Sequence, residues 1–208
     1  MDIKSYDELN EIQRDILKEV GSISVGNAAT ALSALLSQKV RMTVPDVSVL
    51  EYNEAVNTVG NPEDIIAGVL VEMSGDLSGT MLLIEKLDFV NMILKHEFSD
   101  TITDYSTLTE LQISALEEIG NIIISSFINA LSRFTDMNVD LSVPSISVNM
   151  LGGIITVPMA MHGYQTDKVM MIDGKFICDE QEVSSNLLML PDIDSLNRIL
   201  EKLEIKNG

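Results

Sequence analysis

Two stretches of the chain carry apolar residues at helical spacing. Residues 8–37 and 108–135 repeat aliphatic side chains every three or four positions and so predict two long amphipathic helices. Thr107 and Thr109 are both suited to cap the second helix. The predicted apolar faces are Ile16, Leu17, Val20, Ile23, Ser24, Asn27, Ala28 and Ala31 in the first helix, and Ala115, Leu116, Ile119, Ile122, Ile123 and Phe127 in the second.

Shorter apolar and β-branched runs follow each predicted helix and indicate strands. The runs are 40–50, 66–72 and 79–84 in the first half, and 139–148, 153–161, 168–172 and 186–190 in the second. The pairs Gly75-Asp76 and Asp173-Gly174 are typical of turns. Helices set apart from hairpin-linked strands predict an α+β fold with an extended sheet.

The chain contains an internal repeat. Residues 12–45 align without a gap on residues 111–144, with 11 of 34 positions identical, where about two identities are expected by chance. A looser match joins 81–94 to 187–200, in each case an apolar strand followed by an amphipathic helix. We therefore expect one domain of two related halves, 1–105 and 106–208, each too small to bury its apolar surface alone.

Both predicted long helices carry a narrow polar stripe opposite the apolar face. The stripe is Ser114, Glu118 and Asn121 in the second helix, and Asp15, Glu19 and Ser22 at the aligned positions of the first. Residues three or four apart are neighbours on a helix surface. A single Glu-x-x-Asn would be an ordinary solvated face, but the glutamate is retained in both halves while its neighbours have diverged. This retention favours a functional site.

A glycine and a proline are also retained in both halves. Gly21 and Gly120 each cost about 1 kcal/mol inside a helix, which predicts that they pack closely against another backbone segment. Pro45 and Pro144 are each expected to end or bend a strand.

The duplicated pattern resembles the signature of the CheC, CheX and FliY family of chemotaxis phosphatases. It reads Ser114-x3-Glu118-x2-Asn121-x22-Pro144 and Asp15-x3-Glu19-x2-Ser22-x22-Pro45. Two motifs in a chain of this length are similar to the CheC type. The resemblance implies a pseudo-twofold domain in which two long motif-bearing helices flank the sheet.

The resemblance also implies an activity, the hydrolysis of the aspartyl phosphate on the response regulator CheY. In that family the glutamate contacts the receiver lysine and the asparagine holds the attacking water. These roles fall on Glu118 and Asn121, with Ser114 and Asp15 as supporting residues. The enzyme then needs no cofactor or metal of its own, because Mg²⁺ is carried by the receiver. The first half departs from the pattern at Ser22, whose hydroxyl has a shorter reach than a carboxamide, so we expect the Glu19 and Ser22 site to be weak.

A second partner is implied by the same resemblance. CheC proteins pair with the receptor deamidase CheD through a short helix after the second motif, which maps to residues 147–153, with Met150 and Leu151 as anchors. The alternative that both residues are buried core stays open. So does an alternative function, a weakly catalytic or non-catalytic adaptor that binds CheD and phosphorylated CheY.

Composition narrows the choice of partners and compartment. A net charge of -19 disfavours nucleic acid and anionic lipid surfaces as partners. Cys178 is the single cysteine, and the two histidines, His96 and His162, are too far apart to indicate a metal cluster. No apolar run reaches the length of a membrane span. These features are typical of a cytoplasmic protein.

Overall fold

The computed structural model describes residues 3–95, 101–161 and 168–207. The described helices are α1 (Glu11–Leu35), α2 (Tyr52–Val59), α3 (Leu87–Leu94), α4 (Glu110–Thr135), α5 (Leu151–Met161) and α6 (Ile193–Asn207), with short 3-10 turns η1 (Tyr6–Glu8) and η2 (Tyr105–Thr107). The strands are β1 (Val40–Met42), β2 (Asp46–Glu51), β3 (Ile65–Gly75), β4 (Gly79–Glu85), β5 (Val139–Leu141), β6 (Ser145–Met150), β7 (Lys168–Cys178) and β8 (Gln181–Pro191). The α+β fold predicted from the sequence is confirmed.

The described strands form one antiparallel sheet in the order β1-β7-β8-β4-β3-β5, with β2 also on β7 and β6 also on β3. The hairpins β3–β4 and β7–β8 meet at its centre, where β4 pairs with β8. The outer strands are exchanged between the halves, because β1 and β2 pair with β7 while β5 and β6 pair with β3. Each half therefore completes the sheet of the other.

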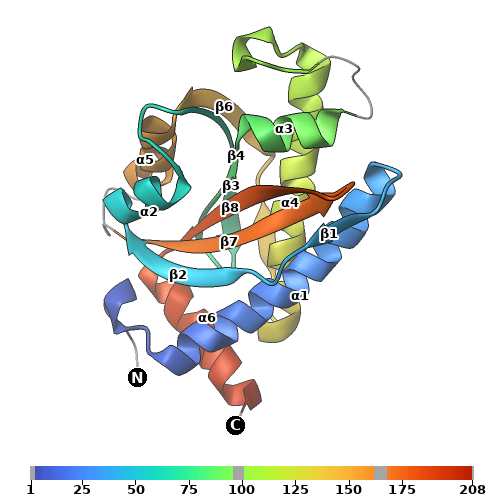
Figure 1. The fold of residues 1–208 in the computed structure, drawn as a ribbon. Helices are drawn as coiled ribbons and strands as arrows, with labels where there is room; N and C mark the ends of the chain where they lie inside the picture. The colour runs from blue at the N-terminus through green and yellow to red at the C-terminus, as the bar shows by residue number, and fades with distance from the viewer. Residues whose placement is uncertain (1–2, 96–100, 162–167, 208) are drawn as a thin grey trace.

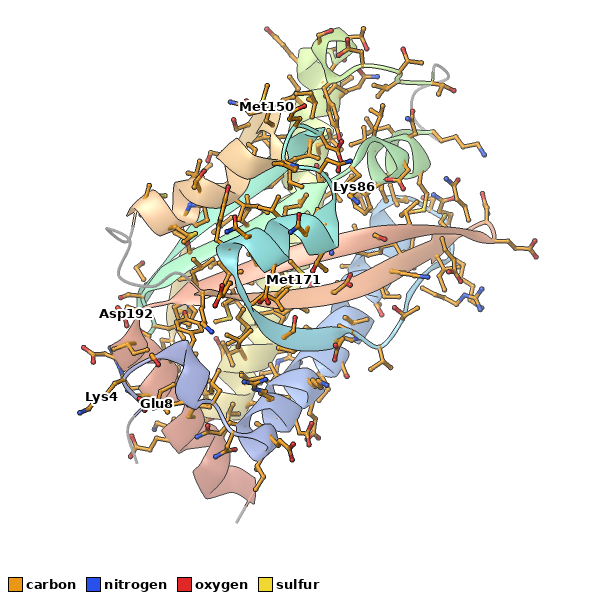
Figure 2. All side chains as sticks on the ribbon, turned by 60° about the vertical axis from the view of Figure 1, so that its left-hand side comes forward. Lys4, Glu8, Lys86, Met150, Met171 and Asp192 are labelled. Carbon is orange, nitrogen blue, oxygen red and sulfur yellow. The ribbon has the colours of Figure 1, made fainter. Side chains whose placement is uncertain are left out.

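The two faces of the sheet are covered by different helices (Figure 1). The long helices α1 and α4 pack against each other and, with α3 and α6, cover one face through a large apolar cluster. The short helices α2 and α5 cover the other face, where Figure 2 shows Met171 beneath α2. By length and composition alone α4 is apolar enough to span a membrane, but here it is a core helix.

Matching capping boxes begin the two long helices. The side chain of Asn10 accepts a hydrogen bond from the Gln13 backbone N–H at 2.9 Å, and Thr109 does the same for Gln112 at 3.3 Å. Each glutamine side chain in turn accepts from the backbone N–H of its cap. Capping satisfies amides that the first turn leaves unpaired. Of the two candidate caps of the second helix, Thr109 is therefore the one used.

The repeat extends further toward the N-terminus than the alignment indicates. Ile3 exchanges two hydrogen bonds with the side chain of Asn197 on α6, and Ile102 exchanges two with the side chain of Asn91 on α3. Because Ile3 and Ile102 are related by the same offset of 99 as the long helices, the second structural repeat begins before residue 106.

Several local predictions are wrong. Asp173-Gly174 is not a turn but lies inside β7, and the chain reverses instead at Asp179 and Glu180, which have positive φ. Residues 153–161 form most of helix α5 rather than a strand, because the buried residues recur at helical spacing. They are Leu151, Ile154, Ile155, Pro158 and Met159. On α1, Ile23 and Asn27 are exposed rather than part of the apolar face.

Candidate functional site on the long helices

Helix α4 presents Glu118 and Asn121 on its outer surface. Glu118 is exposed and Asn121 is half-buried, one turn further along the same face. Within the part of the chain that the structure describes, neither side chain forms a hydrogen bond or an ion pair. Ser114, one turn before Glu118, is also exposed. The three predicted residues thus lie together with free polar groups on a rigid element.

The glycine between them seats the helix on the sheet. A Cβ added at Gly120 would lie 2.8 Å from Cγ1 of Val69 on β3, and one at Gly21 would lie 3.2 Å from Cγ of Pro45. The prediction of close packing is confirmed, but the contacts are with side chains rather than backbone. The absence of a Cβ lets α4 press against β3, which fixes Asn121 relative to the core.

The first-half stripe has the same scaffold but different contacts. Asp15 and Glu19 are exposed, and Ser22 is half-buried with its hydroxyl donating to the Lys18 carbonyl at 2.9 Å. Lys18 Nζ lies 2.8 Å from a carboxylate oxygen of Asp46, and this hydrogen bond raises the pKa of Lys18. Ser22 is therefore turned back onto its own helix instead of outward.

A cavity of about 190 Å³ opens beside Glu118. It lies between the end of α1, the end of α3 and the first half of α4. Its lining residues are Leu35, Leu36, Ile93, Leu94, Ala115, Glu118 and Ile119. The catalytic candidate Glu118 is thus also part of an apolar depression.

Each site is preceded by an exposed apolar residue in the first turn of its helix. Ile12 is 70% exposed and Leu111 is 67% exposed, and the offset of the repeat relates them. Sequence reasoning missed these residues and the cavity. The signal available was the alignment of the halves, which puts a large apolar residue at 12 and 111 and a small one, Ala115, opposite Ile16.

The predicted CheD anchors do not lie together on the surface. Met150, the last residue of β6, is 50% exposed, and Figure 2 shows it near the start of α5. Leu151 is 0% exposed, because it starts the buried face of α5. The expected short helix at 147–153 is wrong, since 147–150 belong to the edge strand β6 and the helix runs from 151 to 161. Leu151 cannot anchor a partner in this conformation.

No group of three or more histidine, cysteine, aspartate or glutamate side chains arranged for a metal occurs among the described residues. His96 and His162 lie outside them. Cys178 is buried, and this burial raises the pKa of its thiol. A nucleophilic role for that thiol is disfavoured, because a raised pKa reduces the thiolate fraction.

Known proteins resemble this chain in sequence over nearly its whole length. The pattern of the CheC-like family matches residues 12–49 and 111–148, the two repeats. The CheY-P phosphatase CheC of Bacillus subtilis (strain 168) is 30% identical over 202 residues, which cover 95% of this chain and 97% of that protein. This chain belongs to the CheC-like family.

A longer relative and a solved structure share the same unit. The flagellar motor switch phosphatase FliY of Bacillus subtilis (strain 168) is 30% identical over 147 residues, covering 71% of this chain and 38% of that protein. The X-ray structure of Thermotoga maritima FliY superposes with a TM-score of 0.75 at 20% identity, covering 96% of this chain and 99% of that chain. The fold expected from the resemblance is therefore shared with a solved structure.

Proposed function

We propose that this CheC-like chain hydrolyses the aspartyl phosphate of phosphorylated CheY in the cytoplasm, mainly through Glu118 and Asn121. The observation that carries the proposal is the free, outward-facing pair on α4, in a chain 30% identical to a CheY-P phosphatase. The pair also lies within residues 111–148, the second stretch that the CheC-like pattern matches.

The reaction needs little from the enzyme. An acyl phosphate with bound Mg²⁺ is already activated, so the helper protein has only to orient a water in line with the phosphorus. A carboxamide can accept a hydrogen bond from the water and donate one to a phosphate oxygen. Asn121 has both groups unoccupied by other described residues. The Mg²⁺ belongs to the substrate receiver.

Glu118 has a different role. An exposed carboxylate one turn from Asn121 can pair with the lysine of the receiver and so align the phosphate with the amide. Ser114 lies one turn before Glu118 on the same face and supports this contact, as Asp15 does beside Glu19. The first-half site stays weak in this account, because the Ser22 hydroxyl is bonded to the Lys18 carbonyl.

The direct test is phosphate release from a Mg²⁺-loaded, phosphorylated CheY receiver. The parent should accelerate decay, Asn121→Ala should lower the rate about a hundredfold, and the matched Ser22→Ala should change it less than twofold. If the parent does not accelerate decay, with CheD absent or added, the chain is a binding adaptor and the catalytic assignment is wrong.

CheD is the second proposed partner, with Met150 as the remaining anchor. An exposed thioether at the end of an edge strand offers an adaptable apolar contact. Met150→Lys should weaken capture of purified CheD, whereas Val157→Lys, at an exposed apolar position on the neighbouring helix α5, should not. Equal capture by both variants would remove Met150 from the interface.

A further inference from the structure

The cavity beside Glu118 has a solvent-facing mouth and an apolar floor. Leu36, Ile93, Leu94 and Ile119 form the floor, and all four are buried. Leu35 and Glu118 are exposed and Ala115 is half-buried at the mouth. Its volume of about 190 Å³ exceeds the roughly 150 Å³ of an apolar cavity that accepts a benzene-sized group. The space therefore accommodates a large aliphatic or aromatic side chain.

Two larger side chains lie at the equivalent positions beside Glu19. The offset of 99 relates Ala115 to Ile16 and Leu35 to Phe134. Both larger residues are partly buried and pack against the core. On the floor, the second offset of 106 relates Ile93 and Leu94 to the same residue types at 199 and 200. Leu36 and Ile119, however, correspond to Thr135 and Val20. The cavity beside Glu118 thus has two smaller residues at its rim, one from each half, on the side of the fold where Glu118 and Asn121 lie.

We propose that this cavity is a docking pocket for an apolar side chain of the same phosphorylated receiver that Glu118 and Asn121 act on. The proposal rests on the proposed function. Glu118 both lines the cavity and belongs to the catalytic stripe, so a protein whose lysine reaches Glu118 covers the cavity mouth. The surface is continuous, and one partner occupies both parts.

Charge supports an apolar contact at this place. The phosphorylated site of the receiver is negative, and this chain carries a net charge of -19, so long-range electrostatics do not draw the two together. Burial of apolar surface is independent of that repulsion and can supply the affinity. An inserted side chain also fixes the rotation of the receiver about the Glu118 contact, which places the phosphate over Asn121.

The test fills the mouth of the pocket with the side chain that the first half uses. Ala115→Ile should raise KM for the phosphorylated receiver about tenfold, with kcat within twofold, because the lost contact is made in both ground and transition states. Leu35→Phe, at the end of α1, should also raise KM for the phosphorylated receiver. Asn129→Ile, an exposed site later on α4, is the matched control and should leave KM unchanged. The midpoint temperature of thermal unfolding of the Ala115→Ile variant should not fall, because the added atoms occupy empty space.

The outcomes separate this inference from the proposed function. An active parent whose KM is unchanged in Ala115→Ile and Leu35→Phe overturns the pocket and leaves the phosphatase assignment intact. If the parent lacks phosphatase activity, binding of a beryllofluoride-loaded receiver replaces KM as the readout. Weaker binding by both variants then supports the pocket without catalysis, and equal binding by parent and variants overturns it.

Discussion

The two long helices carry the same scaffold with different surfaces. Both begin with a capping box and both present a glutamate on an exposed face. Each also has a glycine in close contact with a neighbouring segment, Gly120 with Val69 and Gly21 with Pro45. They differ at the next polar position, where Asn121 is free and Ser22 is bonded to the backbone of its own helix. The fold supplies two platforms, and under the proposed function the residue at this polar position decides which one works.

The residues around the two glutamates also differ. Beside Glu19, Lys18 is held by Asp46, and Ile16 and Phe134 pack against the core. Beside Glu118, Ala115 and Leu35 leave an open cavity. The proposed catalytic residue Glu118 and the proposed docking pocket therefore adjoin, and the pocket is lined by residues of both halves. The two halves thus share a framework and differ in the residues beside the retained glutamate.

The largest expected effect is the loss of the working glutamate. Glu118→Ala should lower phosphate release from the receiver about a hundredfold, as expected when one preorganised contact to the reacting group is removed. Glu19→Ala, its partner in the repeat, should lower release less than twofold. Comparable losses in the two variants would show that both halves work and would break the comparison.

A smaller, opposite effect is expected from repairing the first half. Introducing Ser22→Asn into a chain that already carries Asn121→Ala should recover phosphate release about tenfold, because a carboxamide reaches past the helix backbone where the hydroxyl does not. Recovery stays partial, since the larger Ile16 and Phe134 lie beside Glu19 at the positions where Ala115 and Leu35 line the cavity beside Glu118. The same assay measures it, and no recovery would show that Ser22 is not what limits the first site.

The smallest expected effect concerns stability and again compares the halves. Tyr105 donates to the Glu85 carbonyl and Tyr6 to the Pro191 carbonyl, both at 2.6 Å, at positions related by the repeat. The side chain of Glu85 is a fully buried carboxyl with no hydrogen-bond partner among the described residues. Burial raises the pKa of Glu85 well above its usual value.

The sign of the pH dependence follows from that shift. In the unfolded chain Glu85 ionises near pH 4.3, while in the folded protein it keeps its proton to higher pH. Glu85 therefore lowers the free energy of unfolding of the parent as the pH rises from its unfolded pKa to its raised folded pKa. Glu85→Met should raise the free energy of unfolding by about 1–3 kcal/mol at pH 8, and by less at pH 4. Denaturant unfolding at both values, with exposed Glu72→Met as control, measures this. A larger gain at pH 4 than at pH 8 would contradict the buried-acid account.

Much of the framework could be predicted from the sequence because it rests on local patterns. The two long helices, the strand-helix units at 81–94 and 187–200 and the breaks at Pro45 and Pro144 follow from periodicity, turn chemistry and the repeat. The polar stripe could also be predicted, because Ser114, Glu118 and Asn121 are set by helical geometry alone.

The remainder depends on tertiary contacts. Helix α5 is rich in β-branched residues that favour strands. It is nevertheless helical, because its apolar residues pack into the cluster between the sheet and the helices α2 and α5. The same packing buries Leu151, which the sequence left open as a surface anchor. Ser22 was singled out for its short reach, whereas its bond to Lys18 is visible only in the structure. The cavity requires three helices to meet, which no single segment encodes.

The central claim is that the carboxamide of Asn121 makes the second half the working site. Asn121→Ser tests it most directly, because it gives α4 the residue that α1 already carries. In single-turnover phosphate release from the Mg²⁺-loaded receiver, Asn121→Ser should fall to the level of Asn121→Ala. Retention of the parent rate by Asn121→Ser would show that a hydroxyl is sufficient and that the two halves do not differ in the way described.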